Sequence, residues 1–307
     1  MPAAIEDAAR RRAEARAARD WETADRLRAE IEAAGWRVID AGVRYRVERA
    51  SPASIEVGGE IRYGRSEDVP SRLDEPPTGL ASVIFLASGD KFANRRSLAA
   101  LDDAVPAGVD VVVVADGVDV DASTTHEVLR TSAPLGRGAA LNIGIRRARA
   151  AIVIAIDSSI VPSGDVITPL VDVLRDPTVA VAGPFGLVSS DLRLFNEAVP
   201  SGEPVDVTAV QGELIAFRRA DAAGRGPIDE GFRISRYLDV WLSLVLRDEG
   251  EDRPARRAVA VPGLALERGE PVARPSVPSK QRDRLSKRSF YRLLDRFRTR
   301  LDLAVPP

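Results

Sequence analysis

The hydrophobic pattern of residues 80–183 alternates between two periods. Uninterrupted apolar runs predict buried strands, and apolar residues at three- and four-residue spacing between them predict helices. The strand runs are SVIFLA, VDVVVVA, AIVIAI and TVAVAG, and helices are expected at 94–104, after the Gly-rich loop at 135–138, and at 165–175. Strands that alternate with helices predict an α/β domain with a largely parallel sheet and helices on both faces.

The pattern after Gly183 is looser. GELIAFRR predicts a further strand, IDEGF a turn and YLDVWLSLVLRDEG a helix. Five apolar residues of this helix share one face and are expected to be buried: Leu238, Trp241, Leu242, Val245 and Leu246. Asp239 lies off this stripe at the helix start, where a carboxylate either takes part in chemistry or favours the helix dipole.

The chain before residue 80 is organised differently. Residues 1–34 predict two helices, residues 36–49 a β-hairpin turned at Ala41-Gly42, and Gly58-Gly59 the turn of a second hairpin. Pro76-Pro77 cannot continue a helix or a central strand, so we place a domain boundary there. The predicted organisation is a module at 1–49, a hairpin and Pro-rich linker at 50–79, the α/β domain at 80–270 and a C-terminal helix at 280–303.

Composition excludes several classes of function. The chain has 307 residues, 45% of them hydrophobic, and a formal net charge of -2, which argues against nucleic-acid binding by the chain as a whole. The absence of cysteine excludes disulfides, thiol catalysis and Cys-ligated zinc. The single histidine, His126, lies in a polar segment, where we expect it at the surface without a partner.

The N-terminus lacks the apolar core of a signal peptide, and no apolar run approaches the ~18 residues of a membrane span. We therefore expect a cytoplasmic bacterial protein.

Two acidic residues follow predicted buried strands. Asp116 comes after VDVVVVA, and Asp157 comes after AIVIAI. Open α/β sheets bind ligands at the carboxyl ends of their strands. The Gly-rich loop between them has neither the G-x-G-x-x-G spacing of dinucleotide folds nor the G-K-[ST] of a phosphate loop. We interpret residues 109–157 as a βαβ unit that presents two acids to a nucleotide sugar.

The order of motifs over residues 80–270 resembles that of family 2 glycosyltransferases, which have the GT-A fold. VVVVADGVDVD is similar to the family's V-D-N-G-S-x-D segment, LGRGAALNIGIRRAR to its Gly-rich loop and helix, and AIVIAIDSSIVPSGD stands where the family has D-x-D. AFRRADAAGRGPIDEGF and YLDVWLSLVLRDEG resemble its last two motifs. The resemblance implies a hexosyltransferase-type enzyme that moves a sugar from a nucleotide-diphosphate sugar to an acceptor.

The resemblance also implies roles for individual residues. Asp116 would hold the nucleotide base or ribose, and Asp157 the ribose or a metal ion. Asp239 would be the base that takes the acceptor's proton in an inverting transfer. On the donor side, Arg137 either approaches phosphate or lies in solvent, and Asn142 either contacts the donor or, as we favour, braces the loop.

The sequence departs from the family pattern at the metal site. The D-x-D motif reads Asp157-Ser158-Ser159, so a hydroxyl replaces the last carboxylate, and no late histidine pattern follows. A Mn²⁺ or Mg²⁺ cofactor, which prefers carboxylate oxygens, would keep only Asp157 there. The alternative function is therefore a binding or scaffold protein that retains the GT-A fold without catalysis. Asp229 and Glu230 are either acceptor-side acids or caps of a loop.

Both terminal segments indicate further partners. The start resembles the end of cysteinyl-tRNA synthetases through Asp20, Trp21, Ala24, Asp25, Leu27, Arg28, Ala34, Gly35, Val38 and Asp40. We favour a helical hairpin that serves as an interaction or packing module over tRNA contact, because 11 arginines in residues 1–49 are offset by 10 acids. Between Lys280 and Arg300, nine basic and two acidic residues accompany an apolar stripe of Phe290, Leu293, Leu294, Phe297 and Leu301. Such a helix either packs on the domain, which we favour, or lies on the anionic inner face of the membrane.

Overall fold

The chain forms two compact units. The computed structural model describes every residue except 1, 42–43, 200–201, 235–236, 251 and 270–278. The units are Met1–Ala53 and Ser54–Pro307. This division lies before the boundary predicted at Pro76-Pro77.

The first unit consists of two helices and a β-hairpin, as predicted. Its elements are α1 (Ala3–Ala17), α2 (Trp21–Ala33), β1 (Trp36–Ala41) and β2 (Arg44–Arg49). Arg12 of α1 is only 4% exposed and donates to both carboxylate oxygens of Asp40 in β1, at 2.9 and 3.0 Å. The Arg12 guanidinium holds the pKa of Asp40 below its ordinary value. The predicted turn residue Gly42 lies outside the described residues.

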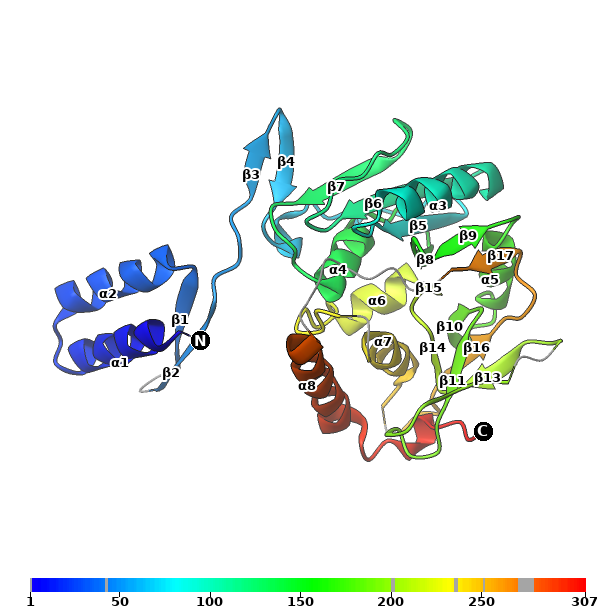
Figure 1. The fold of residues 1–307 in the computed structure, drawn as a ribbon. Coiled ribbons are helices and arrows are strands. Elements are labelled where there is room, and N and C mark those ends of the chain that lie inside the picture. The colour runs from blue at the N-terminus through cyan, green and yellow to red at the C-terminus, as the bar shows by residue number, and fades with distance from the viewer. Residues whose placement is uncertain (1, 42–43, 200–201, 235–236, 251, 270–278) are drawn as a thin grey trace. The chain divides into compact units, whose positions relative to one another are not determined.

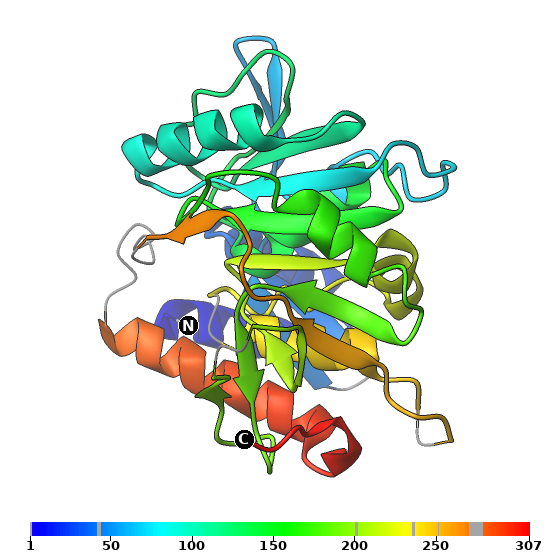
Figure 2. The ribbon, with the colours of Figure 1, turned by 90° about the vertical axis from the view of Figure 1, so that its right-hand side faces the viewer.

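A ten-stranded mixed sheet dominates the second unit, in the order β13-β16-β10-β15-β8-β5-β6-β7-β4-β3 (Figures 1 and 2). Its strands are β3 (Ile55–Val57), β4 (Glu60–Tyr63), β5 (Ala81–Leu86), β6 (Val109–Ala115), β7 (Glu127–Thr131), β8 (Ile152–Asp157), β10 (Val179–Gly183), β13 (Val205–Val207), β15 (Leu214–Arg218) and β16 (Arg257–Ala260). Shorter strands are β9 (Ile160–Pro162), β11 (Gly186–Val188), β12 (Asn196–Glu197), β14 (Ala209–Val210) and β17 (Leu266–Arg268). The four predicted strands of residues 80–183 are confirmed as β5, β6, β8 and β10.

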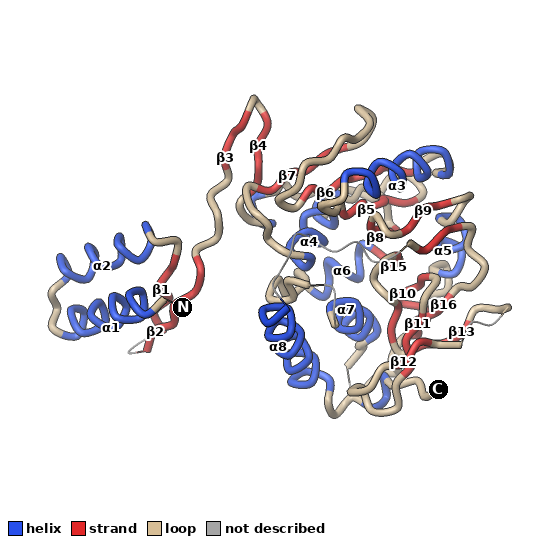
Figure 3. The backbone as a smooth tube through the Cα atoms, in the orientation of Figure 1, coloured by secondary structure: helices blue, strands red, loops and turns tan. Residues whose placement is uncertain are grey.

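Helices cover both faces of the sheet (Figure 3). They are α3 (Lys91–Ala104), α4 (Arg137–Arg147), α5 (Ile167–Val173), α6 (Arg219–Arg225), α7 (Leu238–Arg247) and α8 (Ser279–Phe297), with 3-10 turns at η1 (Ser66–Asp68) and η2 (Leu301–Leu303). Successive side chains of a strand point to opposite faces. Accordingly, Ile84 and Leu86 of β5 join the core formed with α4 and α7, while Phe85 joins the core formed with α3 and α5.

The direction of the strands places the two predicted acids at one edge. Strands β8, β5, β6 and β7 are parallel, and β15 runs antiparallel between β8 and β10. The carboxyl ends of β6 and β8 therefore lie at the same edge of the sheet, where Asp116 and Asp157 stand. The sheet is mixed because β15, β13 and β3 each run antiparallel to their neighbours.

The hairpin predicted at Gly58-Gly59 forms as β3 and β4, but it is part of the large sheet. Its second strand pairs in parallel with β7, with Arg62 opposite Arg130 and Tyr63 opposite Thr131. Local sequence predicts the turn, whereas this pairing joins residues far apart in the chain.

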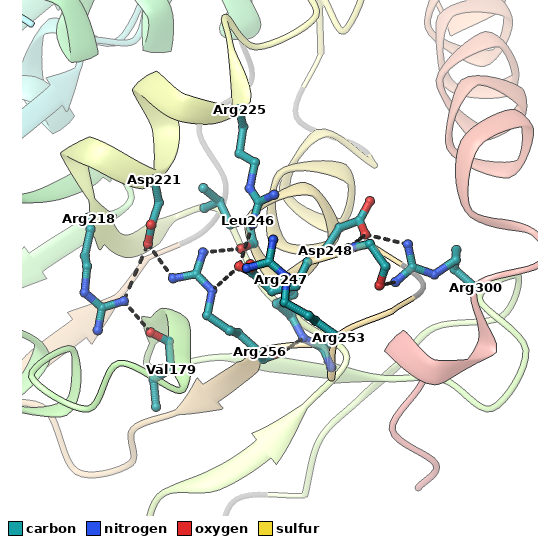
Figure 4. Close-up of polar contacts among 12 residues, drawn as sticks. Val179, Arg218, Asp221, Arg225, Leu246, Arg247, Asp248, Arg253, Arg256 and Arg300 are labelled. Carbon is teal, nitrogen blue, oxygen red and sulfur yellow. Dashed lines mark hydrogen bonds and ion pairs between the residues drawn. The ribbon is translucent and has the colours of Figure 1, made fainter.

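The C-terminal segment packs against the rest of the second unit. Leu293 and Phe297 of α8 are 0% and 1% exposed, so the helix packs on the domain, which is the alternative we favoured. Leu301, predicted to belong to the same apolar stripe, is 55% exposed and does not pack with it. Buried Arg247 of α7 donates to the carbonyl oxygens of Thr208 and Leu303, at 2.6 and 2.8 Å. Figure 4 shows the neighbouring ion pair between Arg300 and Asp248. Among the described helices, none is long and apolar enough to cross a membrane.

The surface position predicted for His126 is wrong. Its side chain is 4% exposed, and its Nε2 lies 2.7 Å from Oδ1 of Asp102 in α3. The connection between β6 and β7 folds back on α3, a contact between segments 24 residues apart that the local sequence does not indicate.

Candidate active site

Asp116, directly after β6, organises the Gly-rich loop. Its Oδ1 accepts hydrogen bonds from Leu135 N at 2.6 Å and Thr131 Oγ1 at 3.1 Å, and its Oδ2 accepts one from Gly136 N at 2.8 Å. Gly136 has a φ of 107°, and a Cβ there would lie 2.9 Å from Arg233 Cα, so only glycine fits. The Asp116 carboxylate thus fixes the chain at the start of α4.

The first N–H groups of α4 also have partners within the protein. Arg137 N donates to Arg233 O and Gly138 N to Phe232 O, at 3.4 and 3.2 Å. Asn142, 5% exposed, braces the same segment, because its amide accepts from Ile228 N at 2.8 Å and donates to Ile228 O at 2.9 Å. The loop before α4 is therefore covered by residues 228–233.

Arg137 and Asp157 form a largely buried ion pair. Arg137 Nη1 lies 3.0 Å from Asp157 Oδ2, and the two side chains are 7% and 20% exposed. The other oxygen of Asp157 accepts from Ser159 N at 3.1 Å and Ser159 Oγ at 2.5 Å. Arg137 also donates to Gly212 O. Arg137 is therefore not a solvated arginine, and the serine of the altered D-x-D motif binds the remaining aspartate.

Asp239 lies at the start of α7, next to Gly212. Its Oδ2 accepts from Gly212 N at 3.2 Å and its Oδ1 from Val240 N at 2.9 Å. A Cβ on Gly212 would lie 3.1 Å from Asp239 Cβ, a closer approach than most side chains allow. The pKa of Asp239 is raised to about 6, mainly by burial and in smaller part by the Glu213 carboxylate, while the N–H groups of Val240 and Gly212 and the Arg137 guanidinium oppose the rise. Gly212 thus links Asp239 to the pair of Arg137 and Asp157.

Glu213 and Arg268 belong to this site and are absent from the predicted set. Arg268 Nη2, at the end of β17, donates to Glu213 Oε1 at 2.9 Å and to Gln211 Oε1 at 2.6 Å. The Arg268 guanidinium carbon also lies 4.1 Å from the centre of the Phe185 ring. The two charged partners are 55 residues apart in the chain, so sequence spacing gives no signal for their pairing.

The residues around Asp157 do not fit a divalent cation. Such ions require several oxygen ligands, usually carboxylates. Among the described residues, no three His, Cys, Asp or Glu side chains gather in a group that could hold a metal ion. The Asp157 carboxylate is instead surrounded by a guanidinium, a hydroxyl and an N–H, which are hydrogen-bond donors.

Asp229 and Glu230, the predicted acceptor-side acids, are both bound by protein donors. Asp229 forms an ion pair with Arg292 of α8 and accepts from Gly231 N at 2.8 Å. Glu230 accepts from Ser66 Oγ and, at 3.0 Å, from Asn142 Nδ2. Their contacts tie α4, η1 and α8 to the loop before α7, and their role toward an acceptor stays a prediction.

Residues 109–219 match the family model for glycosyl transferase family 2. This span contains Asp116, the Gly-rich loop, Arg137, Asp157 and Gly212. The fold is GT-A. The match supports the resemblance drawn from the motifs, and a mixed sheet with helices on both faces is the architecture predicted for it. No curated protein matches the chain.

Two solved glycosyltransferase structures share the GT-A fold with this chain. One is GalNAc-T7 with UDP, GalNAc and Mn²⁺, at 15% identity and a TM-score of 0.55, covering 72% of this chain and 49% of that one. The chain thus spans about half the length of that structure. The other is the mannosyltransferase PcManGT from Pyrobaculum calidifontis with GDP-Man and Mn²⁺, at 17% identity and a TM-score of 0.50, covering 77% of this chain and 71% of that one.

Proposed function

We propose that the chain transfers a sugar from a nucleotide-diphosphate sugar to an acceptor hydroxyl, with inversion at the anomeric carbon and Asp239 as the base. The observation that carries the proposal is the position of Asp239 at the start of α7, linked through Gly212 to the pair of Arg137 and Asp157 in a GT-A fold. Its raised pKa, about 6, supports the role of a base. The structures that share this fold were solved with UDP and with GDP-Man, which supports a nucleotide sugar as the donor.

A base with this pKa suits proton transfer near neutral pH. At pH 7 a carboxyl with a pKa of about 6 is mostly ionised, yet it binds a proton far more strongly than an ordinary aspartate. The negative charge of Glu213 stabilises the protonated form that arises as the acceptor hydroxyl attacks. Asp239 would hold that proton at its carboxylate oxygens.

The departing nucleotide diphosphate also needs positive charge, and Arg137 is the nearest cation to Asp157 among the described contacts. A guanidinium carries five N–H donors and binds phosphate oxygens well. We assign the stabilisation of the leaving group to Arg137, with Asp157 holding its guanidinium in place. Asp116 would serve the donor by shaping the loop before α4, and Asn142 by bracing that loop.

Calorimetric titration with UDP, GDP and the corresponding sugar nucleotides tests this function. Because the positive charge is supplied by Arg137, we expect saturable binding of at least one nucleotide in EDTA, with little gain from Mn²⁺ or Mg²⁺. Release of nucleoside diphosphate from the bound sugar nucleotide should follow. If no nucleotide binds with or without metal, the proposal fails.

The second candidate is a non-catalytic binding protein with the GT-A fold. The replacement of the last D-x-D carboxylate by Ser159 favours it, since the hydroxyl only binds Asp157. Nucleotide binding without any release of nucleoside diphosphate, across a panel of sugar nucleotides and acceptors, would identify this alternative.

A peripheral contact of α8 with an anionic membrane surface is a further part of the proposed function. The apolar side of α8 is buried through Leu293 and Phe297, so only its outer side is open to a partner. Arg284, Lys287 and Arg288 are exposed there and line one shallow groove. Each basic residue near an anionic membrane contributes about 1 kcal/mol of attraction.

A further inference from the structure

A cavity of about 360 Å³ lies among the loops around β11, β12 and β16. This volume is within the range of about 300–1,000 Å³ that is usual for small-molecule sites. Its wall includes apolar side chains, among them Phe185, Val205 and Leu264, and four polar ones, Glu197, Glu203, Gln211 and Arg268. A few polar groups set in an apolar wall are typical of a site that binds and orients a small ligand.

The cavity adjoins the base of the proposed reaction. Gln211 lines it, and the next residue, Gly212, donates its N–H to Asp239 at 3.2 Å. Consecutive Cα atoms are only about 3.8 Å apart. Gln211 in the cavity wall is therefore the direct neighbour of the residue that contacts Asp239. Arg268, also in the wall, reaches from the cavity to Glu213 at 2.9 Å.

The charges in the wall favour a neutral ligand. Glu197 accepts from Gln211 Nε2 at 3.3 Å and lies 3.9 Å from Arg268, but its side chain is 72% exposed, so its carboxylate can accept further hydrogen bonds from hydroxyl groups. Among the described residues of the wall the one guanidinium is that of Arg268, whose Nη2 donates to Gln211 and Glu213 and whose Nη1 lies 3.9 Å from Glu197. Two carboxylates, Glu197 and Glu203, therefore outnumber the single cation among the described wall residues, which disfavours a phosphate.

We propose that this cavity binds the acceptor, and that the acceptor end is an uncharged saccharide. The hydroxyls of such a ring match Glu197 and Gln211, and its C–H faces match the apolar wall made by Val205 and Leu264. The cavity holds a small molecule or the end of a longer glycan. The assignment rests on the proposed sugar transfer for its role, but binding in the cavity can be measured without a donor.

Saturation-transfer NMR on the full chain tests the binding directly. The probes are the methyl glycosides of glucose, galactose, mannose and N-acetylglucosamine, each compared with its 6-phosphate. Ala198→Trp and Leu264→Trp place an indole in the cavity from two different loops, and Ala99→Trp, at an exposed position of α3, is the matched control. We expect at least one neutral glycoside to bind, its affinity to fall at least tenfold in both cavity variants, and the control to bind as the wild type does.

Three results would overturn the assignment: no glycoside binds, a bound glycoside is unaffected by both cavity variants, or the phosphates bind more tightly than the neutral sugars. Titrating the same samples with UDP and GDP separates this assignment from the proposed function. Nucleotide binding without glycoside binding contradicts the saccharide cavity alone. If a glycoside binds the wild type but not the cavity variants, and no nucleotide binds, the saccharide assignment of the cavity stands. The proposed nucleotide-sugar donor is then contradicted.

Discussion

The acids at the ends of β6 and β8 differ from the acid at the start of α7 in the groups that bind their oxygens. Asp116 accepts from Thr131, Leu135 and Gly136, and its contacts shape a loop. Asp239 has two backbone N–H partners, one from its neighbour Val240, and lies near the negative Glu213. A carboxylate surrounded by donors is stabilised as an anion, whereas one that is buried near another acid gains affinity for a proton.

This difference separates two kinds of role within one site. Asp116 and Asp157 hold the framework on which a donor would lie, and Asp157 does so through Arg137 and Ser159. Asp239 is the acid whose surroundings favour proton uptake near neutral pH. Substitutions that break the framework should therefore lower stability as well as rate, whereas substitution of Asp239 should lower mainly the rate.

The largest expected effect is that of Asp239→Asn on the transfer rate. Loss of a general base costs about 10²- to 10⁴-fold. The amide oxygen can still accept from Gly212 N, so nucleotide affinity should stay close to that of the wild type. Release of nucleoside diphosphate and calorimetry measure the two quantities, and Asp103→Asn on the exposed side of α3 is the control. Turnover equal to the wild type would remove Asp239 from its role.

Arg137→Met should lower stability as well as the transfer rate, because Arg137 pairs with Asp157 and is also the proposed cation for the leaving group. It leaves Asp157 partly buried without its cation, and breaking a buried pair in this way costs about 3 kcal/mol. Urea unfolding followed by circular dichroism measures the change. Arg175→Met breaks a pair whose side chains are 74% and 50% exposed, so it should change stability little. Equal losses for the two variants would contradict the structural importance of the buried pair.

Glu213→Gln should shift the pH dependence of transfer. The Glu213 carboxylate is one cause of the raised pKa of Asp239, so its neutralisation lowers that pKa. The acid limb of the rate profile should then move to lower pH than in the wild type, while the rate at pH 8 changes less. A limb that stays in place would show that Glu213 does not act on the base.

The smallest expected effect concerns α8. Replacing Arg284 and Lys287 by glutamate should weaken sedimentation with anionic vesicles at low salt by about 1 kcal/mol or more for each residue. Arg175→Glu, at an exposed position in the turn after α5, is the control for reversal of a single charge and should have less effect. If the wild-type chain does not bind vesicles of phosphatidylserine and phosphatidylcholine, the membrane contact is wrong.

The sequence predicts much of the fold because its signals are local. Apolar runs mark β5, β6, β8 and β10, and helical spacing marks α3, α4 and α7. The pairing of β4 with β7 is not predicted, since it depends on contacts between residues 62–63 and 130–131 rather than on periodicity.

The candidate site is predicted less completely. Asp116, Asp157 and Asp239 follow from strand ends and a helix start, because these positions can be read from the local pattern. The partners of these acids cannot be read from the local pattern, because they are distant in the chain. Arg137 and Asp157 are 20 residues apart, and Arg268 and Glu213 are 55 residues apart. The tertiary fold determines which acid is surrounded by hydrogen-bond donors and which acid has a raised affinity for a proton.

The pH dependence of kcat/KM tests most directly whether Asp239 is the base, because it reports the ionisation of the free enzyme. With a pKa of about 6, Asp239 must lose its proton to act, so kcat/KM should fall about tenfold per pH unit below pH 6 and level off above about pH 7. The residual activity of Asp239→Asn should lack this limb. A wild-type profile that stays flat from about pH 5 to pH 8, or a limb that persists in Asp239→Asn, would contradict the assignment.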